Sequence, residues 1–246
     1  MRIGVQLYSL RSSFGSNLWG TFDRLAEAGF KHVELAGLYG LEPAALAAGL
    51  RERGLSVCSA HVNLAAMESN LDKEIAAGKE LGYSTIVVPI VNAGQFAGGW
   101  AEIGSRVKAA SESAAASGFL VGYHNHAFEF EPDGERTAYE TFWAHAGERV
   151  ICELDYYWVA KARRNPLEWI ERMKSKLRLA HFKDINPQTG GFEVVGNGMI
   201  DWDLAIAASK DAGVEFAIIE HDQPPSDPVD CVVESRKFLL DKGLVD

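Results

Sequence analysis

Residues 120–156, LVGYHNHAFEFEPDGERTAYETFWAHAGERVICELDY, contain one complete repeat of the pattern that decides the fold. The repeat opens with a short apolar run, Leu120–His126, and closes with a second one, Val150–Tyr156. Short apolar runs of this length are typical of buried β-strands. Between them, Ala138–Ala146 carries apolar residues at helical spacing. The stretch therefore predicts a strand, a helix and a second strand.

The same unit recurs along the whole chain. We expect strands at Ile3–Tyr8, His32–Ala36, Ser56–His61, Thr85–Val91, Leu120–His126, Val150–Tyr156, Arg178–Lys183 and Glu215–His221. We expect helices at Trp19–Ala28, Pro43–Arg53, Leu71–Leu81, Trp100–Ser117, Ala138–Ala146, Pro166–Lys176, Asp203–Ala212 and Pro228–Leu240. Several of these helices are followed by glycine, the usual residue just beyond a helix C-terminus.

Regular alternation of strand and helix indicates a parallel sheet. A doubly wound sheet usually has a glycine-rich first turn, whereas here the first strand continues into Ser9–Arg11 without glycine. The length of 246 residues suits one α/β barrel. We therefore predict a single domain, residues 1–246, folded as an α/β, (β/α)8 TIM barrel.

Charge and cysteine content exclude several classes of protein. The chain has 34 acidic and 24 basic residues, a formal net charge of −10, and such a surface repels nucleic acids and anionic membranes. The three cysteines, Cys58, Cys152 and Cys231, are far apart and predict reduced thiols and a cytoplasmic location. No signal peptide and no membrane-spanning run is recognised.

Polar side chains gather at the ends of the predicted strands. The segments are SAHVN (59–63), YHNH (123–126), CELDYYW (152–158), AHFKD (180–184) and IIEHD (218–222). Residues two apart on a strand share a face, and the carboxyl ends of barrel strands meet at one mouth. Because burying unpaired charges costs several kcal/mol, the last four of these segments, which end four consecutive strands, need a common partner. The pattern predicts one divalent metal ion, Mn²⁺, Co²⁺, Zn²⁺ or Mg²⁺.

Each residue also has an ordinary structural interpretation when it is taken alone. Lys183 could form a salt bridge with Asp184, Asp222 could cap a helix or anchor a loop, and Trp158 could simply pack. These interpretations explain single residues, whereas the coincidence of four neighbouring strand ends favours the metal site.

Together the segments resemble the xylose isomerase-like TIM barrels. The resemblance runs from GVQLYSLR (4–11) through AGFKHVELAG (28–37) to VGNGMIDW (195–202) and IIEHDQPP (218–225). Its most specific part, YHNHAFEF (123–130), is similar to the sugar phosphate isomerase/epimerase branch. The resemblance implies that Asp155, His181 and Glu220 bind the metal.

The chain departs from the ketose epimerases of this superfamily at one ligand. Those enzymes supply a glutamate from the fifth strand, and His124 stands at the matching position here. Either His124 is the fourth ligand or Glu153 reaches the ion. The endonuclease branch needs further His and Glu ligands and a basic face, so the acidic charge argues against it.

Such a site implies a metal-dependent isomerase or epimerase that acts on a keto-sugar or related polyol ketone through an enediolate. We expect Lys183, Glu153 and Glu220 to be catalytic, with His126 and Glu129 as further candidates for the base. The residues expected to bind substrate are His61, His126, Glu129, Trp158 and Tyr8. The wall around the sugar would also include Phe128. No clear glycine-rich anion nest is present, which favours a substrate without phosphate.

Two alternative functions stay open at this point. Expulsion of a β-hydroxyl from the same intermediate would make the protein an inosose-type dehydratase, a lyase. If the polar residues at the barrel mouth only bind a sugar and catalyse no reaction, the protein would be a non-catalytic sugar-binding barrel. We also expect a possible homo-oligomer, because Trp100, Trp143 and Trp169 lie near predicted loops and could form a partner surface.

Overall fold

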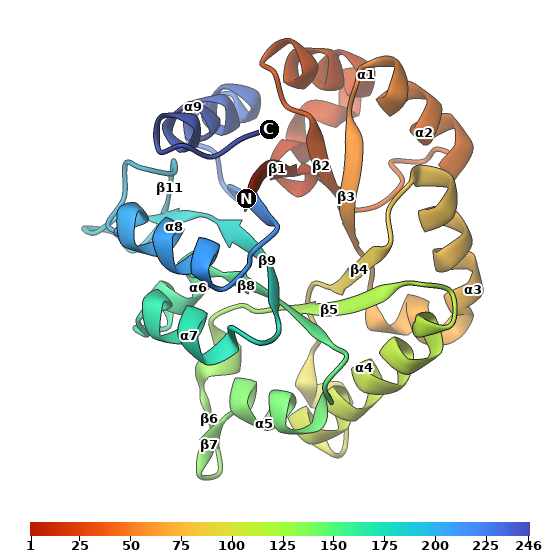
Figure 1. Ribbon diagram of the computed structural model, residues 1–246, viewed down its shortest axis with the longest axis vertical. Coiled ribbons are helices and arrows are strands. Elements are labelled where there is room, and N and C mark those ends of the chain that lie inside the picture. The colour runs from red at the N-terminus through yellow and green to blue at the C-terminus, as the bar shows by residue number, and fades with distance from the viewer.

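The computed structural model describes residues 1–246, except for the side chain of Ser16. Eight parallel strands close into a barrel, and helices surround it (Figure 1). The barrel strands are β1 (Arg2–Gln6), β2 (His32–Leu35), β3 (Ser56–His61), β4 (Thr85–Val88), β5 (Leu120–His124), β8 (Ile151–Asp155), β9 (Leu177–Phe182) and β12 (Phe216–Ile219). Neighbours in the barrel follow chain order, and β12 pairs with β1 to complete the closure.

Helices follow the strands as the alternation predicts. They are α1 (Arg11–Glu27), α2 (Pro43–Glu52), α3 (Leu64–Leu81), α4 (Gly99–Ala115), α5 (Ala138–His145), α6 (Tyr156–Lys161), α7 (Pro166–Met173), α8 (Trp202–Asp211) and α9 (Pro228–Asp241). Short 3₁₀ helices are η1 (Leu7–Leu10), η2 (Ala93–Gln95) and η3 (Phe128–Phe130). Two small hairpins, β6 (Pro132–Asp133) with β7 (Arg136–Thr137) and β10 (Asp184–Ile185) with β11 (Phe192–Glu193), occupy the two long loops.

The predicted (β/α)8 barrel is confirmed, with differences at the element ends. The expected first strand is too long, because the Gln6 side chain accepts a hydrogen bond from Tyr8 N and starts η1 there. Helix α6 is missing from the prediction, because its aromatic residues look like a continuing strand. The Asp155 side chain instead accepts from Trp158 N and caps a helix at that point.

Helices α1 and α3 are longer than expected. Each begins with an extra segment that joins the predicted helix across a kink, at Asn17 in α1 and at Asn70 in α3. The apolar spacing identifies only the second part of each, because the kink interrupts the helical period.

The core lies inside the barrel and between the barrel and its helices, as parallel strands require. All five residues of β8 are buried. Trp169 is also buried, at 4% exposed, and Trp100 and Trp143 pack partly buried against the core. Trp169 is therefore a core residue and not part of a partner surface. A partner surface that includes Trp100 and Trp143, and homo-oligomer formation itself, stay predictions.

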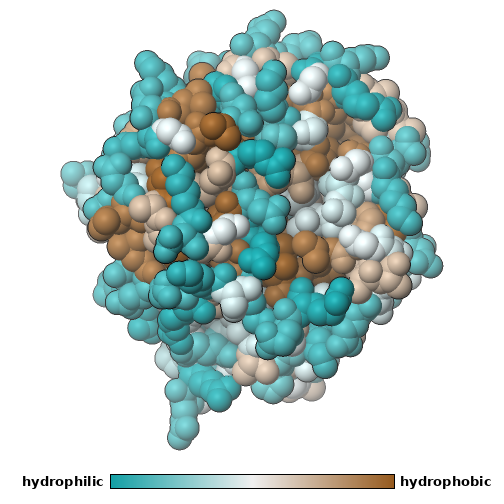
Figure 2. All heavy atoms as spheres, in the orientation of Figure 1, coloured by the Kyte–Doolittle hydropathy of each residue, from teal (hydrophilic) through white to brown (hydrophobic). Residues whose placement is uncertain are grey.

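The chain ends meet beside β1, where Ile3 N donates to Val245 O over 2.7 Å (Figure 1). Hydrophilic residues cover much of the face seen in that view, with apolar patches between them (Figure 2). Within the described residues, no helix is both long and apolar enough to cross a membrane.

Candidate active site

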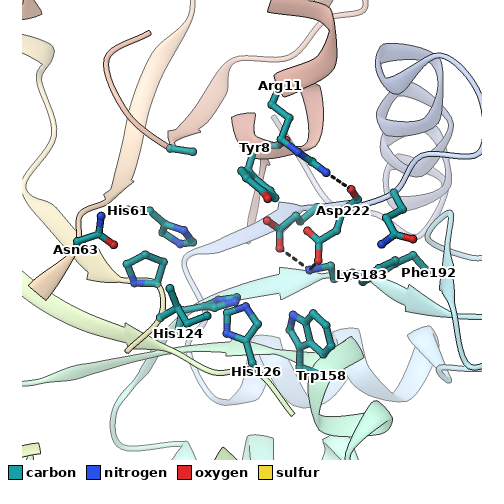
Figure 3. A pocket seen from close by; sticks show the side chains of 15 residues that line it. Tyr8, Arg11, His61, Asn63, His124, His126, Trp158, Lys183, Phe192 and Asp222 are labelled. Carbon is teal, nitrogen blue, oxygen red and sulfur yellow. Dashed lines mark hydrogen bonds and ion pairs between the residues drawn. The ribbon is translucent and has the colours of Figure 1, made fainter. Parts of the chain in front are cut away.

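A cavity of about 490 Å³ opens among the loops that follow the barrel strands (Figure 3). Seven of the residues selected from the sequence line it: Tyr8, His61, His124, His126, Trp158, Lys183 and Glu220. The lining also includes Arg11, Asn63, Phe192 and Asp222. Asn63 and Asp222 end two of the predicted strand-end segments, whereas strand periodicity does not place Arg11 or Phe192. The cavity therefore lies at the end of the barrel where the strand-end pattern predicted a site.

Four buried side chains at the base of this cavity can hold a metal ion. One ligand atom from each of His124, Asp155, His181 and Glu220 lies within 4.8 Å of the other three. The first three come from the neighbouring strands β5, β8 and β9, and Glu220 follows β12 directly. We name these four residues the outer cluster; they are the ligands expected from the sequence, with His124 as the fourth.

A second set of donors, the inner cluster, shares two histidines with the first. It consists of His61, His124, Glu153 and His181. Oε2 of Glu153 lies 2.8 Å from Nε2 of His61, 3.3 Å from Nε2 of His181 and 3.3 Å from Nδ1 of His124. Glu153 is fully buried and does not line the cavity. If Glu153 binds an ion, it therefore does so in the inner cluster and not beside Asp155 and Glu220.

The donor types fit a divalent ion. Two imidazoles and two carboxylates form the outer cluster, a set that suits Zn²⁺, Co²⁺ or Mn²⁺. Nδ1 of His124 and Oε1 of Glu153 are buried and lack a hydrogen-bond partner among the described residues. Both atoms belong to the inner cluster, because His124 faces Glu153 through Nδ1 and faces Asp155 of the outer cluster through Nε2. Because unpartnered buried polar atoms are rare, they indicate that the inner cluster accommodates a further polar or cationic group.

Lys183 supplies a buried positive charge beside the outer cluster. Its Nζ lies 2.7 Å from Glu220 Oε2, 2.8 Å from Asp222 Oδ2 and 3.3 Å from Asp155 Oδ2. Burial opposes the charged form, but the three carboxylates outweigh it and raise the pKa of Lys183. The alternative interpretation, a salt bridge between Lys183 and Asp184, is wrong, because the carboxylates that Lys183 contacts are those of Glu220, Asp222 and Asp155.

The same charges give the acids of the site different pKa values. Burial raises the pKa of Asp155 to about 6, although Lys183 and His181 oppose the shift. Burial acts in the same direction on Glu220, but Lys183 and His181 prevail and hold its pKa well below the ordinary range. Burial and the Glu34 charge both raise the pKa of Glu153. Glu220 is therefore the acid of this group that keeps its charge most firmly.

Aromatic rings form one wall of the cavity around Lys183. Its Nζ lies 5.2 Å from the ring centre of Trp158 and 5.4 Å from that of Phe192. The rings of His126 and Trp158 are 5.1 Å apart. Figure 3 shows His126, Trp158 and Phe192 on the side of the cavity where Lys183 lies. This wall can pack against an apolar ring face while the opposite side supplies hydrogen bonds.

The expected direct contact between Glu129 and substrate is not what the structure shows. Glu129 is fully buried and accepts hydrogen bonds from Tyr123 Oη (2.9 Å) and His126 N (2.8 Å). Burial raises its pKa to about 7 despite those bonds. The chain turns into η3 immediately after His126 and points this side chain inward. Glu129 therefore holds the His126 loop rather than lining the cavity.

Phe192 lies in β11, in the long loop after β9, and this loop brings its ring to the cavity. The Asp184 carboxylate accepts from Gly196 N (3.0 Å), Gly198 N (3.1 Å) and Trp202 Nε1 (2.6 Å). It thereby fixes the segment that contains β11. In the sequence, residues Asn186–Asp201 form a long irregular stretch directly after a predicted strand, which is the only signal for this loop. The position of the Phe192 ring depends on the contacts of Asp184.

Fold and site together define a class: a (β/α)8 barrel with a buried, metal-competent histidine and carboxylate cluster at its C-terminal mouth. The chain belongs to the xylose isomerase-like TIM barrel family, whose pattern matches residues 22–242. Among curated proteins, no sequence matches it.

Solved structures share the fold over essentially the whole chain. Two sugar phosphate isomerase/epimerases from Parabacteroides distasonis are 23% and 18% identical, with TM-scores of 0.83 and 0.86. Each alignment covers 100% of this chain, and 95% and 99% of the respective relatives. The IOLI protein with a bound zinc atom is 14% identical over 98% of this chain and 97% of its own, with a TM-score of 0.73.

Proposed function

We propose that the protein is a metal-dependent isomerase or epimerase that converts a keto-sugar or related polyol ketone through an enediolate. The observation that carries the proposal is the outer cluster at the base of the cavity, with the ammonium of Lys183 beside it. Acids, imidazoles and a cation that converge on one cavity are typical of enzyme sites where charge develops during reaction. The sugar phosphate isomerase/epimerases among its structural relatives agree with this class.

His124, Asp155, His181 and Glu220 would hold the ion. When bound, a divalent ion supplies Lewis acidity that stabilises negative charge on a neighbouring carbonyl or hydroxyl oxygen. Lys183 would donate a hydrogen bond to the same developing charge, because its Nζ lines the cavity and holds its proton firmly. Trp158 and Phe192 would pack against the substrate and exclude water.

Geometry reduces the candidates for the base that removes the proton. Glu153 and Glu129 do not line the cavity, and their carboxylates are bonded to His61 and to the His126 loop. Glu220 and His126 both face the cavity. We assign the proton transfer to Glu220, and His126 is the second candidate, which the substrate would also contact.

The test begins with the metal. Purified protein is analysed for bound metal, stripped with a chelator, reloaded and incubated in ²H₂O with a panel of ketoses, aldoses and inososes. We expect turnover that depends on the metal, with solvent deuterium entering the carbon next to the carbonyl. Isomerised or epimerised product supports the proposal, and a dehydrated product would instead identify a lyase. Tight sugar binding without turnover in any metal form would identify a binding protein and contradict the proposal.

A Glu220→Gln variant tests the base, provided that it is assayed at a metal concentration that calorimetry shows to saturate it, because the substitution also weakens metal binding. Loss of deuterium exchange in this variant, with exchange retained in His126→Asn, supports Glu220 as the base. The reverse pattern assigns the proton transfer to His126.

A further inference from the structure

A layer of buried polar side chains lies on three of the four barrel strands that do not supply the outer cluster. Gln6, Glu34 and Ser59 come from β1, β2 and β3, each is fully or almost fully buried, and none lines the cavity. A carboxylate so far from solvent is costly unless it is fully hydrogen-bonded. The layer therefore needs a structural or functional reason beyond substrate contact.

The Glu34 carboxylate is held in one orientation. Its Oε1 accepts from Gln6 Nε2 at 2.7 Å, and its Oε2 accepts from Ser59 Oγ at 2.7 Å. The amide of Gln6 is itself fixed, because its Oε1 accepts from Tyr8 N at 3.0 Å. Glu34 is thus a rigid acceptor, placed before any ligand arrives.

That acceptor faces one particular nitrogen of His181. Oε1 of Glu34 lies 2.8 Å from Nε2 of His181, whereas Nδ1 of the same ring lies 3.0 Å from Glu220 Oε2. A ring nitrogen that binds a metal carries no proton, and the other nitrogen then carries it. A carboxylate that accepts at Nε2 leaves Nδ1 free to bind an ion.

His181 belongs to both clusters, but it contributes a different nitrogen to each. Nδ1 is beside Glu220 in the outer cluster, and Nε2 is beside Glu153, at 3.3 Å, in the inner cluster. We propose that Glu34 is a positioning residue: by holding Nε2–H of His181, it directs Nδ1 to the metal and so selects the outer cluster over the inner one. This inference rests on the proposed function, because it presumes a metal at the outer cluster.

The test measures metal binding rather than turnover. Wild-type protein, Glu34→Gln, His61→Gln and Glu220→Gln are titrated with Zn²⁺ by calorimetry. We expect a loss of affinity of about 10- to 100-fold for Glu34→Gln, the usual effect of removing a carboxylate that orients a ligand histidine. We expect a larger loss for Glu220→Gln than for His61→Gln, since His61 belongs only to the inner cluster and contacts Glu34 Oε1 (3.2 Å) rather than an outer-cluster ligand atom.

A spectroscopic measurement separates positioning from a general structural role. In Zn²⁺-loaded protein labelled with ¹⁵N-histidine, His181 should show a protonated Nε2 and a metal-bound Nδ1. In Glu34→Gln this signature should weaken or become heterogeneous. If Glu34→Gln does not fold, Ser59→Ala removes one of the hydrogen bonds that orient Glu34 and should lower the affinity by a smaller factor.

The outcomes distinguish this inference from the proposed function. Zn²⁺ bound through Nε2 of His181, or affinity lost in His61→Gln but kept in Glu220→Gln, would overturn the selection of the outer cluster. Equal affinity and an unchanged His181 signature in Glu34→Gln would overturn the role of Glu34 while the metal site stands. A wild-type protein that binds no divalent ion would overturn both.

Discussion

Nζ of Lys183 and Nδ1 of His181 both contact one oxygen, Oε2 of Glu220, at 2.7 Å and 3.0 Å. An ammonium therefore occupies part of the space around a carboxylate that also belongs to the outer cluster. Lys183 and a divalent ion would share Glu220 and Asp155 as partners. Metal affinity and the position of this ammonium are consequently coupled.

Replacement of Lys183 by methionine tests that coupling. We expect Lys183→Met to lower turnover by about 100-fold or more, because one donor to the developing charge is lost. The metal-free variant should also be less stable, since two buried carboxylates and the partly buried Asp222 lose their cation. Added Zn²⁺ should recover a larger share of the melting temperature than it does in wild type. Thermal unfolding with and without metal, together with initial rates, measures both effects; unchanged turnover would remove Lys183 from the mechanism.

The outer cluster predicts that two acids on one loop, Glu220 and Asp222, differ in their effect on metal affinity. Glu220→Gln should reduce metal affinity strongly, because it removes a ligand. Asp222→Asn is the matched control: Asp222 contacts Lys183 but is not in the cluster, so the loss of affinity should be much smaller. Calorimetric titration of both variants is the measurement. Equal losses would show that the loop charge, and not ligation, governs binding.

Glu129 predicts a pH dependence of stability. Its pKa is raised to about 7 by burial, so the folded protein holds this proton more tightly than the unfolded chain. The stability contributed by the protonated form is present below the ordinary pKa of glutamate and is lost as the pH rises toward 7. Glu129→Gln removes the titrating carboxyl group, and with it this pH-dependent contribution to stability, while it keeps the shape of the side chain.

The stability of wild type relative to Glu129→Gln should fall by about 3 kcal/mol between about pH 4 and pH 8. Urea unfolding at a series of pH values measures the difference. A difference that rises with pH would mean that the carboxylate is stabilised as an anion by Tyr123 and the His126 amide.

The contacts of the Asp184 carboxylate predict that this residue controls the position of the cavity wall at Phe192. Asp184→Asn removes the charge and an acceptor from a group that fixes Gly196, Gly198 and Trp202. We expect a destabilisation of about 2 to 4 kcal/mol and faster hydrogen exchange in residues 186–201. Because Phe192 belongs to this segment, KM should rise more than kcat falls. A segment that exchanges as slowly as in wild type would contradict the role.

The sequence by itself determined the barrel, because alternating apolar runs and amphipathic segments leave few other ways to bury both faces of parallel strands. It also indicated that polar strand ends gather at one mouth, since residues two apart on a strand share a face and neighbouring strands end together, and the resemblance to the family implied which of them form the outer cluster. Neither inference depends on the exact paths of the loops.

Only the tertiary structure decided which of these polar groups reach the cavity. Glu153 and Glu220 look equivalent in the sequence, but Glu153 lies behind His61 while Glu220 follows β12 into the cavity. The contact between Glu34 and His181 joins residues 147 positions apart. Such pairings depend on strand register, which shifts at a bulge between Cys152 and Glu153, and on barrel closure. Local periodicity carries no information about either, because it fixes the face of a residue and not its height in the barrel.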